Sequence, residues 1–314
     1  MSEASQSLPE FTIWIVSDGR RGIENQALGL AEAVTRALGV QTRIERATVR
    51  KDGFVTLPAA SHPDLWIGCG RAAVKVARKH RRIFSDTFFV YVQDPRSRYD
   101  TFDLIVAPEH DRLARGNVLT MTGSPNRITR AQLDAARTQF ATRIDTLPSP
   151  RAAVLVGGAS KRFRITPEIG DYLERRIAGL VERGLGVMVT VSRRTPEAVR
   201  QALAARFAED PRVWFFDGEG ENPYFAFLAS ADWIFVTEES TNMILEAAAT
   251  GRPVYLLAMA GKPGKFSRLH AALEARGHIR PFLGELDTWT SPPLAETDRI
   301  ARALIERWRP EPVK

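Results

Sequence analysis

Cysteine and long apolar runs are what this 314-residue sequence has least of. A single cysteine, Cys69, excludes an internal disulfide and a zinc site built from several cysteines, and it fits a reducing compartment. No apolar run approaches the ~20 residues that cross a bilayer, and the polar opening MSEASQSLPE has no signal-peptide core. The sequence also lacks internal repeats and low-complexity tracts. These absences predict a cytoplasmic protein.

Histidine is scarce as well, with five residues, whereas basic residues are abundant. Lys plus Arg number 44 against 37 Asp plus Glu, which gives a net charge of +7 and an isoelectric point near 9.8. That excess favours anionic partners such as phosphates, nucleotides, nucleic acid or an acidic membrane surface. The hydrophobic content of 44% is typical of a folded globular protein, and the length is about twice a single domain of ~150 residues.

Short apolar runs alternate with helical patterns along the whole chain, which predicts an α/β protein with parallel sheets. The stretch 145–151, with two prolines, divides the pattern into a domain over 1–147 and a domain over 148–314. Each half opens with a strand and a glycine-containing loop, so we expect two Rossmann-like domains facing each other across a cleft. The final helix belongs to the second domain or packs back on the first. The expected strands are 11–17, 42–49, 64–70, 87–93, 102–108, 151–158, 186–192, 212–217, 231–237 and 252–258, and the helices are 24–39, 71–80, 129–145, 167–183, 196–208, 240–251, 265–277 and 296–308.

The loop after the first strand, Ser17 to Gly22, is dense in polar groups. Its glycines allow a ligand to approach the backbone, and the following helix N-terminus favours negative charge. The loop does not match G-x-G-x-x-G, so no dinucleotide fingerprint is present. An ordinary turn with Asp18 as a helix cap is the simpler interpretation. The candidate residues here are Asp18, Gly19, Arg20, Asn25 and Gln26.

Two further turns in the first half end strands with polar residues. In Gln93-Asp94-Pro95-Arg96, Asp94 and Arg96 suit an acceptor site, since an arginine holds phosphate or carboxylate; a plain turn fits equally well. In Pro108-Glu109-His110-Asp111, His110 lies beside two carboxylates, which suits a general base. A surface histidine is the alternative.

The second half repeats this arrangement at two loops. Gly157 to Lys161 follows an apolar strand and offers backbone N–H groups, the Ser160 hydroxyl and the Lys161 charge to a phosphate, although it is not a Walker A loop. The next strand ends at Ser192 and Arg193, ahead of a helix with Thr195 as the expected N-cap and Pro196 at its first position. Its two arginines pair with phosphate or are only solvated.

The strongest motif runs from Thr237 to Glu246, where a strand ends and a helix begins. Free N–H groups and two hydroxyls are placed at the sheet edge, and Glu246, one turn further, suits a ribose diol. Acidic residues near a helix start also complement its dipole, which is the simpler explanation. The candidate nucleotide-binding residues are Gly158, Ser160, Lys161, Ser192, Arg193, Glu239, Ser240, Thr241, Asn242, Met243 and Glu246.

The segment EESTNMILEAAATGRPVYLL resembles the nucleotide-sugar half of GT-B glycosyltransferases. By that resemblance Glu246 binds the donor ribose, and Gly158, Ser160 and Ser240 line the diphosphate. Nearly the whole chain resembles the mitochondrial-fission Elm family, whose bacterial branch is described as glycosyltransferase-like. The matching pieces are SDGRRGIENQALGLAEAV, QDPR, PEHD, GGASKRF, VTVSRRTP, EESTNMILEAAATGRPVY and KFSRLHAALEARGHIRPF. The plant branch is similar to a recruiter of division machinery to the mitochondrial surface.

These resemblances imply a GT-B glycosyltransferase that moves a sugar from a UDP- or GDP-linked donor to an acceptor at the inner face of a membrane. It needs no metal or cofactor, because Lys161, Arg193 and the helix over 240–250 stabilise the departing diphosphate. Asp18 and His110 are the candidate bases. The alternatives are a nucleotide-sugar epimerase, for which five histidines are few, and a non-catalytic scaffold. Nucleic-acid binding is not expected, since the basic run 78–82 lacks interleaved aromatics and suits a solvated helix end or an anionic membrane surface.

Overall fold

A computed structural model describes residues 11–57, 62–160 and 162–309 and divides the chain into two compact units. Unit 1 comprises Met1–Arg127 and Ala295–Lys314, and unit 2 comprises Ile128–Leu294. The units divide about twenty residues before the expected boundary at 147. The reason is that Leu133, Ile144 and Leu147 are buried in the core of unit 2. The residues just after Arg127 therefore belong to the second unit.

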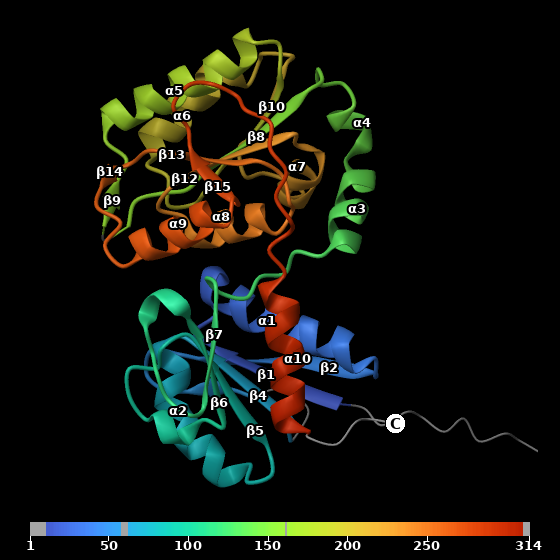
Figure 1. The fold of residues 1–314 in the computed structure, drawn as a ribbon, viewed down its shortest axis with the longest axis vertical. Coiled ribbons are helices and arrows are strands. Elements are labelled where there is room, and N and C mark those ends of the chain that lie inside the picture. The colour runs from blue at the N-terminus through green and yellow to red at the C-terminus, as the bar shows by residue number, and fades with distance from the viewer. Residues whose placement is uncertain (1–10, 58–61, 161, 310–314) are drawn as a thin grey trace, which may run out of the picture. The chain divides into compact units, whose positions relative to one another are not determined.

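Unit 1 contains a seven-stranded sheet of order β3-β2-β1-β4-β5-β6-β7 (Figure 1). All neighbours run parallel except β2 and β3. The chain moves outward from β1 in one direction through β2 and in the other from β4. The point where the order reverses therefore lies between β1 and β4, as in a doubly wound Rossmann sheet. The strands are β1 (Phe11–Ser17), β2 (Thr42–Val49), β3 (Val55–Thr56), β4 (Leu65–Cys69), β5 (Phe88–Val92), β6 (Leu104–Pro108) and β7 (Val118–Met121).

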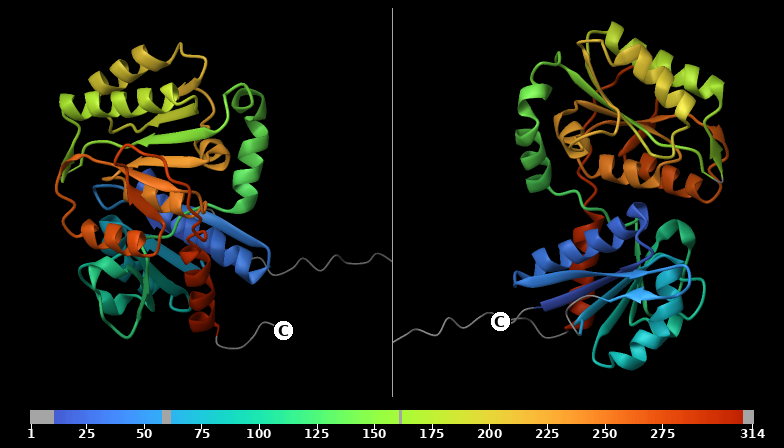
Figure 2. Two further views of the ribbon diagram at one scale, coloured as in Figure 1. Left: turned by 45° about the horizontal axis from the view of Figure 1, so that its top comes forward. Right: turned by 180° about the vertical axis from the view of Figure 1, so that it is seen from behind.

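Helices cover both faces of this sheet. On one face, α1 (Arg21–Leu38) and α10 (Glu296–Trp308) pack together, with Ile300, Ala301 and Leu304 in the same core as the apolar side of α1. On the other face, α2 (Arg71–Ile83) covers the sheet (Figures 1 and 2), and the core between them contains Trp14 and Trp66. The short 3-10 turns η1 (Tyr99–Thr101) and η2 (Glu109–Asp111) follow β5 and β6. The chain's last helix thus completes the first unit.

Unit 2 contains a six-stranded parallel sheet of order β11-β10-β8-β12-β13-β15. This is the Rossmann order again, with its reversal between β8 and β12. The strands are almost wholly apolar, as expected for strands buried on both faces. They are β8 (Arg151–Val156), β10 (Gly186–Val191), β11 (Val213–Phe216), β12 (Trp233–Thr237), β13 (Val254–Leu257) and β15 (Ile279–Pro281).

The helices of unit 2 lie in two layers (Figure 1). The layer of α5 (Pro167–Glu182) and α6 (Glu197–Phe207) forms one core with the sheet. The opposite core contains residues of α3 (Arg130–Gln139), α4 (Ala141–Ile144), α7 (Tyr224–Ser230), α8 (Thr241–Ala248) and α9 (Phe266–Ala275). A separate two-stranded ribbon pairs β9 (Phe163–Arg164) with β14 (Ala260–Gly261). This ribbon joins the loop after β8 to the loop after β13.

Several local expectations are wrong in detail. Helix α1 starts at Arg21, so the loop after β1 is shorter than expected, and its N-cap residue, Arg20, makes no side-chain capping bond. Helix α6 starts at Glu197 after Pro196, so Thr195 is not its cap. The expected helix 129–145 is interrupted at Phe140. Within the described residues, no helix combines the length and apolarity that crossing a membrane requires.

Candidate functional site

The reversal point of unit 2 brings together two loops that lie eighty residues apart. The turn Gly157-Gly158 follows β8, and Thr237 and Glu239 follow β12. The Gly157 N–H donates to Thr237 Oγ1 over 2.8 Å, and the Gly158 N–H donates to Glu239 Oε1 over 2.7 Å. Ligands of doubly wound sheets bind at such reversal points, beyond the carboxyl ends of the strands. The glycine turn is therefore at the expected place, with its two amides bonded to side chains of the neighbouring strand end.

Both positions of this turn require glycine. A Cβ atom at Gly157 would lie 1.8 Å from Glu239 Oε1, and one at Gly158 would lie 2.2 Å from the carbonyl carbon of Arg194. Real Cβ atoms do not approach other atoms so closely. Because Gly157 and Gly158 have no side chains, the Glu239 carboxylate and the loop after β10 can pack directly against the backbone of the turn.

Glu239 is a buried carboxylate at this point, with 8% of its surface exposed. Its Oε2 atom is buried and has no hydrogen-bond partner among the described residues. Burial raises the pKa of Glu239, while hydrogen bonds from Thr237 and Gly158 and the charge of Arg194 oppose that shift. A buried carboxylate with one bonded and one unbonded oxygen is costly to keep ionised.

The loop after β10 closes the same turn from the other side. The Thr195 hydroxyl donates to the Gly157 carbonyl instead of capping α6, and the Ala159 N–H donates to the Arg194 carbonyl over 3.2 Å. The expected ligand Ser192 accepts the Arg194 N–H over 3.1 Å, and Arg193 is exposed. The role of Thr195 was missed by sequence reasoning, because a threonine before a proline is typical of a helix cap.

The rest of the expected phosphate loop is more exposed. Ser160 Oγ accepts the N–H groups of Arg162 and Phe163 over 3.2 and 3.1 Å, so this hydroxyl stabilises its own turn. Lys161 lies outside the described residues. The β9–β14 ribbon follows and carries exposed Arg162, Arg164 and Lys262, three cations that sequence reasoning did not select.

Helix α8 carries the remaining candidates of unit 2. Its N-cap Ser240 makes no side-chain capping bond and is buried, and Thr241, Asn242 and Met243 are half-buried in the first turn. Glu246 Oε2 accepts the Tyr224 hydroxyl of α7 over 2.7 Å. Burial and the Glu246 charge raise the pKa of Tyr224, so the phenol stays protonated. Tyr224 was missed because nothing in its local sequence marks it as polar.

At the reversal point of unit 1, the loop after β1 is closed by its own side chains. The Gly19 N–H donates to Ser17 Oγ over 3.1 Å, and Arg20 pairs with Asp18 over 2.8 Å. Burial raises the pKa of Asp18, but the hydrogen bonds and charge of Arg20 outweigh it and hold that pKa below its ordinary value. Asp18 is therefore an ionised, paired carboxylate.

Gln26 and Gln93 meet beside this loop. The Gln93 side-chain amide donates to Gln26 Oε1 over 2.8 Å, and Gln26 is only 6% exposed in the first turns of α1. Gln93 has a φ of +85°, a strained conformation for a residue with a side chain. The neighbouring Cys69 is buried, and burial raises its pKa to about 12, so its thiol is not a nucleophile at neutral pH. Asn25 is half-buried in the first turn of α1.

The other candidates of unit 1 lie after β5 and β6. Asp94 accepts the N–H of Arg96 over 2.8 Å and the Tyr99 hydroxyl over 3.1 Å, and it pairs with the Arg96 guanidinium. His110 is 7% exposed, and its Nε2 lies 3.8 Å from Asp111 Oδ1. Asp94 and Arg96 are thus bonded within their own turn, and His110 is buried.

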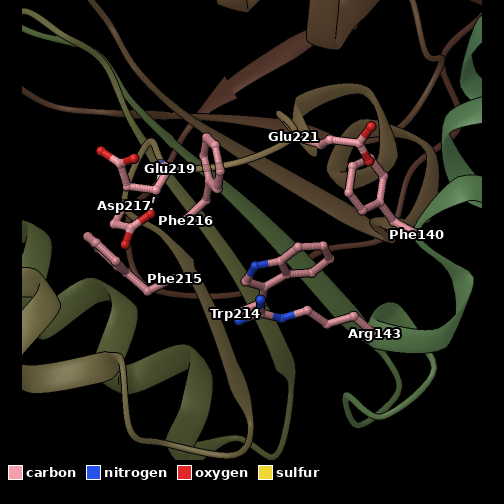
Figure 3. A pocket seen from close by; sticks show the side chains of 8 residues that line it. All are labelled: Phe140, Arg143, Trp214, Phe215, Phe216, Asp217, Glu219 and Glu221. Carbon is pink, nitrogen blue, oxygen red and sulfur yellow. Dashed lines mark hydrogen bonds between the residues drawn. The ribbon is translucent and has the colours of Figure 1, made fainter.

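A cavity of about 370 Å³ lies at the β11 edge of unit 2 and contains none of the expected site residues (Figure 3). Its walls are aromatic and its rim is acidic; Arg143 lies over the Trp214 ring, 4.4 Å from its centre. The acidic rim disfavours an anionic ligand. Among the described residues, no three His, Cys, Asp or Glu side chains are grouped to hold a metal ion. The lining residues are Phe140, Arg143, Trp214, Phe215, Phe216, Asp217, Glu219 and Glu221.

Two Rossmann-like domains with these strand orders define a protein of the GT-B fold class, and solved structures agree. UDP-GlcNAc 2-epimerase from Neisseria meningitidis, solved with UDP-GlcNAc bound, aligns with 94% of this chain and 91% of its own at a TM-score of 0.53 and 11% identity. ADP-heptose LPS heptosyltransferase II from E. coli aligns with 95% and 98% at a TM-score of 0.51 and 12% identity. At such identities the likeness concerns the fold.

The family is given by sequence. The family described as mitochondrial fission ELM1 matches residues 21–308, so the chain belongs to that family. A curated relative, the mitochondrial fission protein ELM1 of Arabidopsis thaliana, is 28% identical over 311 residues, which cover 89% of this chain and 71% of the relative. The resemblance drawn from the sequence motifs is confirmed, as is the two-domain Rossmann-like architecture.

Proposed function

We propose that this protein is a glycosyltransferase that binds a nucleoside-diphosphate sugar in unit 2. One observation carries the proposal: the glycine turn after β8 and the start of α8 lie together at the point where the strand order reverses, between β8 and β12. Backbone amides at such a turn and a helix N-terminus both favour phosphate oxygens. UDP-GlcNAc is bound by one protein of the same fold, the Neisseria epimerase.

The diphosphate is expected at the glycine turn, beside the exposed cations of its loops. Arg193 and Arg194 follow β10, and Arg162 and Lys262 belong to or adjoin the β9–β14 ribbon. Cations around the departing diphosphate stabilise its charge without a metal ion. Gly158, Ser160, Lys161, Ser192, Glu239 and the first turn of α8 remain proposed ligands.

The ribose is expected at Glu246. Its carboxylate already accepts one hydroxyl, that of Tyr224, over 2.7 Å. A ribose diol presents the same donor chemistry, and carboxylates are strong acceptors of such bonds. We propose that Tyr224 positions the Glu246 carboxylate for the sugar hydroxyls.

The acceptor is expected at the carboxyl edge of the unit 1 sheet, where Gly19, Arg20, Asn25, Gln26, Asp94 and Arg96 supply polar groups. Asp18 is the more accessible of the two proposed bases, since His110 is buried. Its low pKa makes it a weak base, so it would act on an acceptor hydroxyl only when bound directly to it. A peripheral location at the inner face of a membrane would give the protein access to a membrane-borne acceptor.

The basic run 78–82 is one proposed membrane contact, and the fold reduces its available charge. His80 is buried with its Nδ1 accepting the Trp66 indole N–H over 3.1 Å, and Arg81 is paired with Asp103. Arg78, Lys79 and Arg82 are exposed and remain available to anionic headgroups.

The test is nucleotide binding by calorimetry, with UDP, GDP, ADP and CMP and their sugar conjugates. We expect Glu246→Ala to weaken binding of the preferred nucleotide at least about tenfold, the scale of one charge-assisted hydrogen bond. Tyr224→Phe removes the same internal bond and keeps the carboxylate, so we expect it to weaken binding less than Glu246→Ala does. Unchanged affinity in Glu246→Ala would remove the ribose assignment, and no heat with any nucleotide would overturn the proposed function.

An epimerase is a second candidate, favoured by the alignment with UDP-GlcNAc 2-epimerase over 94% of this chain. Incubation with UDP-GlcNAc in deuterated water separates the two reactions. Epimerisation at C2, the carbon that carries the acetamido group, would exchange its hydrogen for deuterium, whereas transfer or hydrolysis would release UDP and leave the sugar carbons unlabelled.

A further inference from the structure

The carboxylate of Glu239 already accepts a backbone hydrogen bond at the glycine turn that a bound phosphate would also use. The Gly158 N–H, at the reversal point of the sheet, donates to Glu239 Oε1 over 2.7 Å. A backbone N–H carries a single proton to donate, so a phosphate oxygen and a carboxylate oxygen compete for it. Two anions at one amide would also repel each other in a site with little water.

The fold is built around this carboxyl group. Glycine at position 157 leaves the space that Glu239 Oε1 occupies, since a Cβ there would lie 1.8 Å from it. Glu239 comes directly before Ser240, the N-cap residue of the eight-residue helix α8. Its second oxygen, Oε2, is buried and unbonded among the described residues, in a side chain that is 8% exposed. The Glu239 carboxyl group thus has one hydrogen-bonded oxygen and one without a hydrogen bond among the described residues.

We infer that Glu239 must be neutral for a diphosphate to bind, so that the site takes up one proton with each diphosphate. The inference rests on the proposed function and deepens it. A neutral carboxyl group no longer repels the phosphate and holds the Gly158 N–H by a weaker, uncharged hydrogen bond that a phosphate oxygen can replace. Its protonated oxygen becomes a donor to a phosphate oxygen. Glu239 is therefore a specificity-determining residue that changes from competitor to hydrogen-bond donor.

The charges around Glu239 are mixed. Arg194 faces it from the loop after β10 and favours the ionised form. Glu238 precedes it, with its Oε1 accepting the Met259 N–H over 2.8 Å, and His270 of α9 interacts with the Glu238 backbone. Lys161 of the glycine loop lies outside the described residues. Burial outweighs the attraction to Arg194 and raises the pKa of Glu239, which brings proton uptake closer to neutral pH.

Inorganic diphosphate is the probe, because it tests the anion site without the nucleoside. We expect Glu239→Gln to bind it more tightly than the wild type near pH 8, by about tenfold or more, with the ratio falling towards one as the pH is lowered. The sign follows from linkage. Each unit of pH above the carboxyl pKa lowers the diphosphate affinity of the wild type about tenfold, whereas the glutamine variant has no carboxyl group to protonate and its affinity is unaffected. Comparison of the two proteins cancels the ionisation of the ligand and of His270.

Glu238→Gln is the matched control. It removes a neighbouring carboxylate that is bonded to Met259 and not to the glycine turn, so we expect it to keep the pH dependence of the wild type. Calorimetry of the wild type in buffers of different ionisation heat measures proton uptake without any variant. We expect one more proton for the wild type than for Glu239→Gln near pH 8.

The outcomes separate the two proposals. Equal affinity and equal proton uptake in wild type and Glu239→Gln would overturn the role of Glu239, even if UDP binds to both. A difference with inorganic diphosphate, but no gain from any nucleoside, would support Glu239 and overturn the nucleotide-sugar function. Absence of diphosphate binding in every protein would overturn both.

Discussion

The two units share a strand order, but the loops at the points where that order reverses are held by different kinds of hydrogen bond. In unit 2, the amides of the Gly157-Gly158 turn are bonded to Thr237 and Glu239, eighty residues later in the chain. In unit 1, the amide of Gly19 is bonded to Ser17, two residues earlier. Hydrogen bonds between loops far apart in the chain depend on how those loops pack, whereas a hydrogen bond within one loop tolerates small shifts of its neighbours. The comparison indicates that the second turn is the more constrained and the more sensitive to change.

One added methyl group in each turn tests this difference in constraint most directly. Gly158→Ala would place a Cβ atom 2.2 Å from the Arg194 backbone, and the overpacking should cost about 3 kcal/mol. Gly19→Ala meets nothing nearer than 3.5 Å, so only its φ of +74° opposes the change, at about 1 kcal/mol. Urea unfolding followed by circular dichroism measures both. Equal losses would contradict the difference in constraint.

The two carboxylates at these points provide a smaller contrast with opposite signs. Ionised Glu239 is buried, and its neutralisation in Glu239→Gln should stabilise the protein by about 1 to 2 kcal/mol near pH 8. Because its pKa is raised on folding, the penalty develops as pH rises through the raised value and is absent in acid. The gain in melting temperature should therefore shrink as pH falls.

Asp18→Asn is the counterpart in unit 1. The pKa of Asp18 is lowered on folding, so its ionised form stabilises the protein above the ordinary carboxyl pKa, and that contribution is lost as pH falls through the lowered value. Solvent screening should keep the loss below about 1 kcal/mol near pH 8. Shifts of the same sign in both variants would contradict the assignment of the two environments.

The smallest expected effect concerns the strained backbone of Gln93. Gln93→Ala loses the bond to Gln26 and keeps the positive φ, which should cost about 1 kcal/mol. Gln93→Gly loses the same bond but relieves the strain, so its stability should stay within about 0.5 kcal/mol of the wild type. Thermal unfolding of the pair measures the strain, and identical melting temperatures would argue against it.

The sequence was sufficient for the main architecture, because the central strands are dense apolar runs. β1, β8 and β12 start or end within one or two residues of their expected limits, and the α/β class follows from their alternation with helices. The ribbon of β9 and β14 and the short β15 were missed. With two or three residues each, these strands have too few positions to show a period of two.

The hydrogen bonds between the loops of the site could not be predicted from the sequence, for a different reason. Glu239 lies in a polar run that reads as an exposed helix start, and only the glycine turn eighty residues earlier buries it. Thr195 and Tyr224 likewise gain their roles from partners on other elements, Gly157 and Glu246. Residue type and spacing identified the loops, whereas the pairing of side chains between loops depends on the folded sheet.

The return of the last helix has a consequence for biosynthesis. Helix α10 completes the core of unit 1 against α1, yet all of unit 2 lies between them in the chain. During translation the part of α1 that packs against α10 stays uncovered until unit 2 and α10 have left the ribosome. The first unit is therefore completed last, and unit 2, which is continuous in the chain, is the part that can reach its native state first.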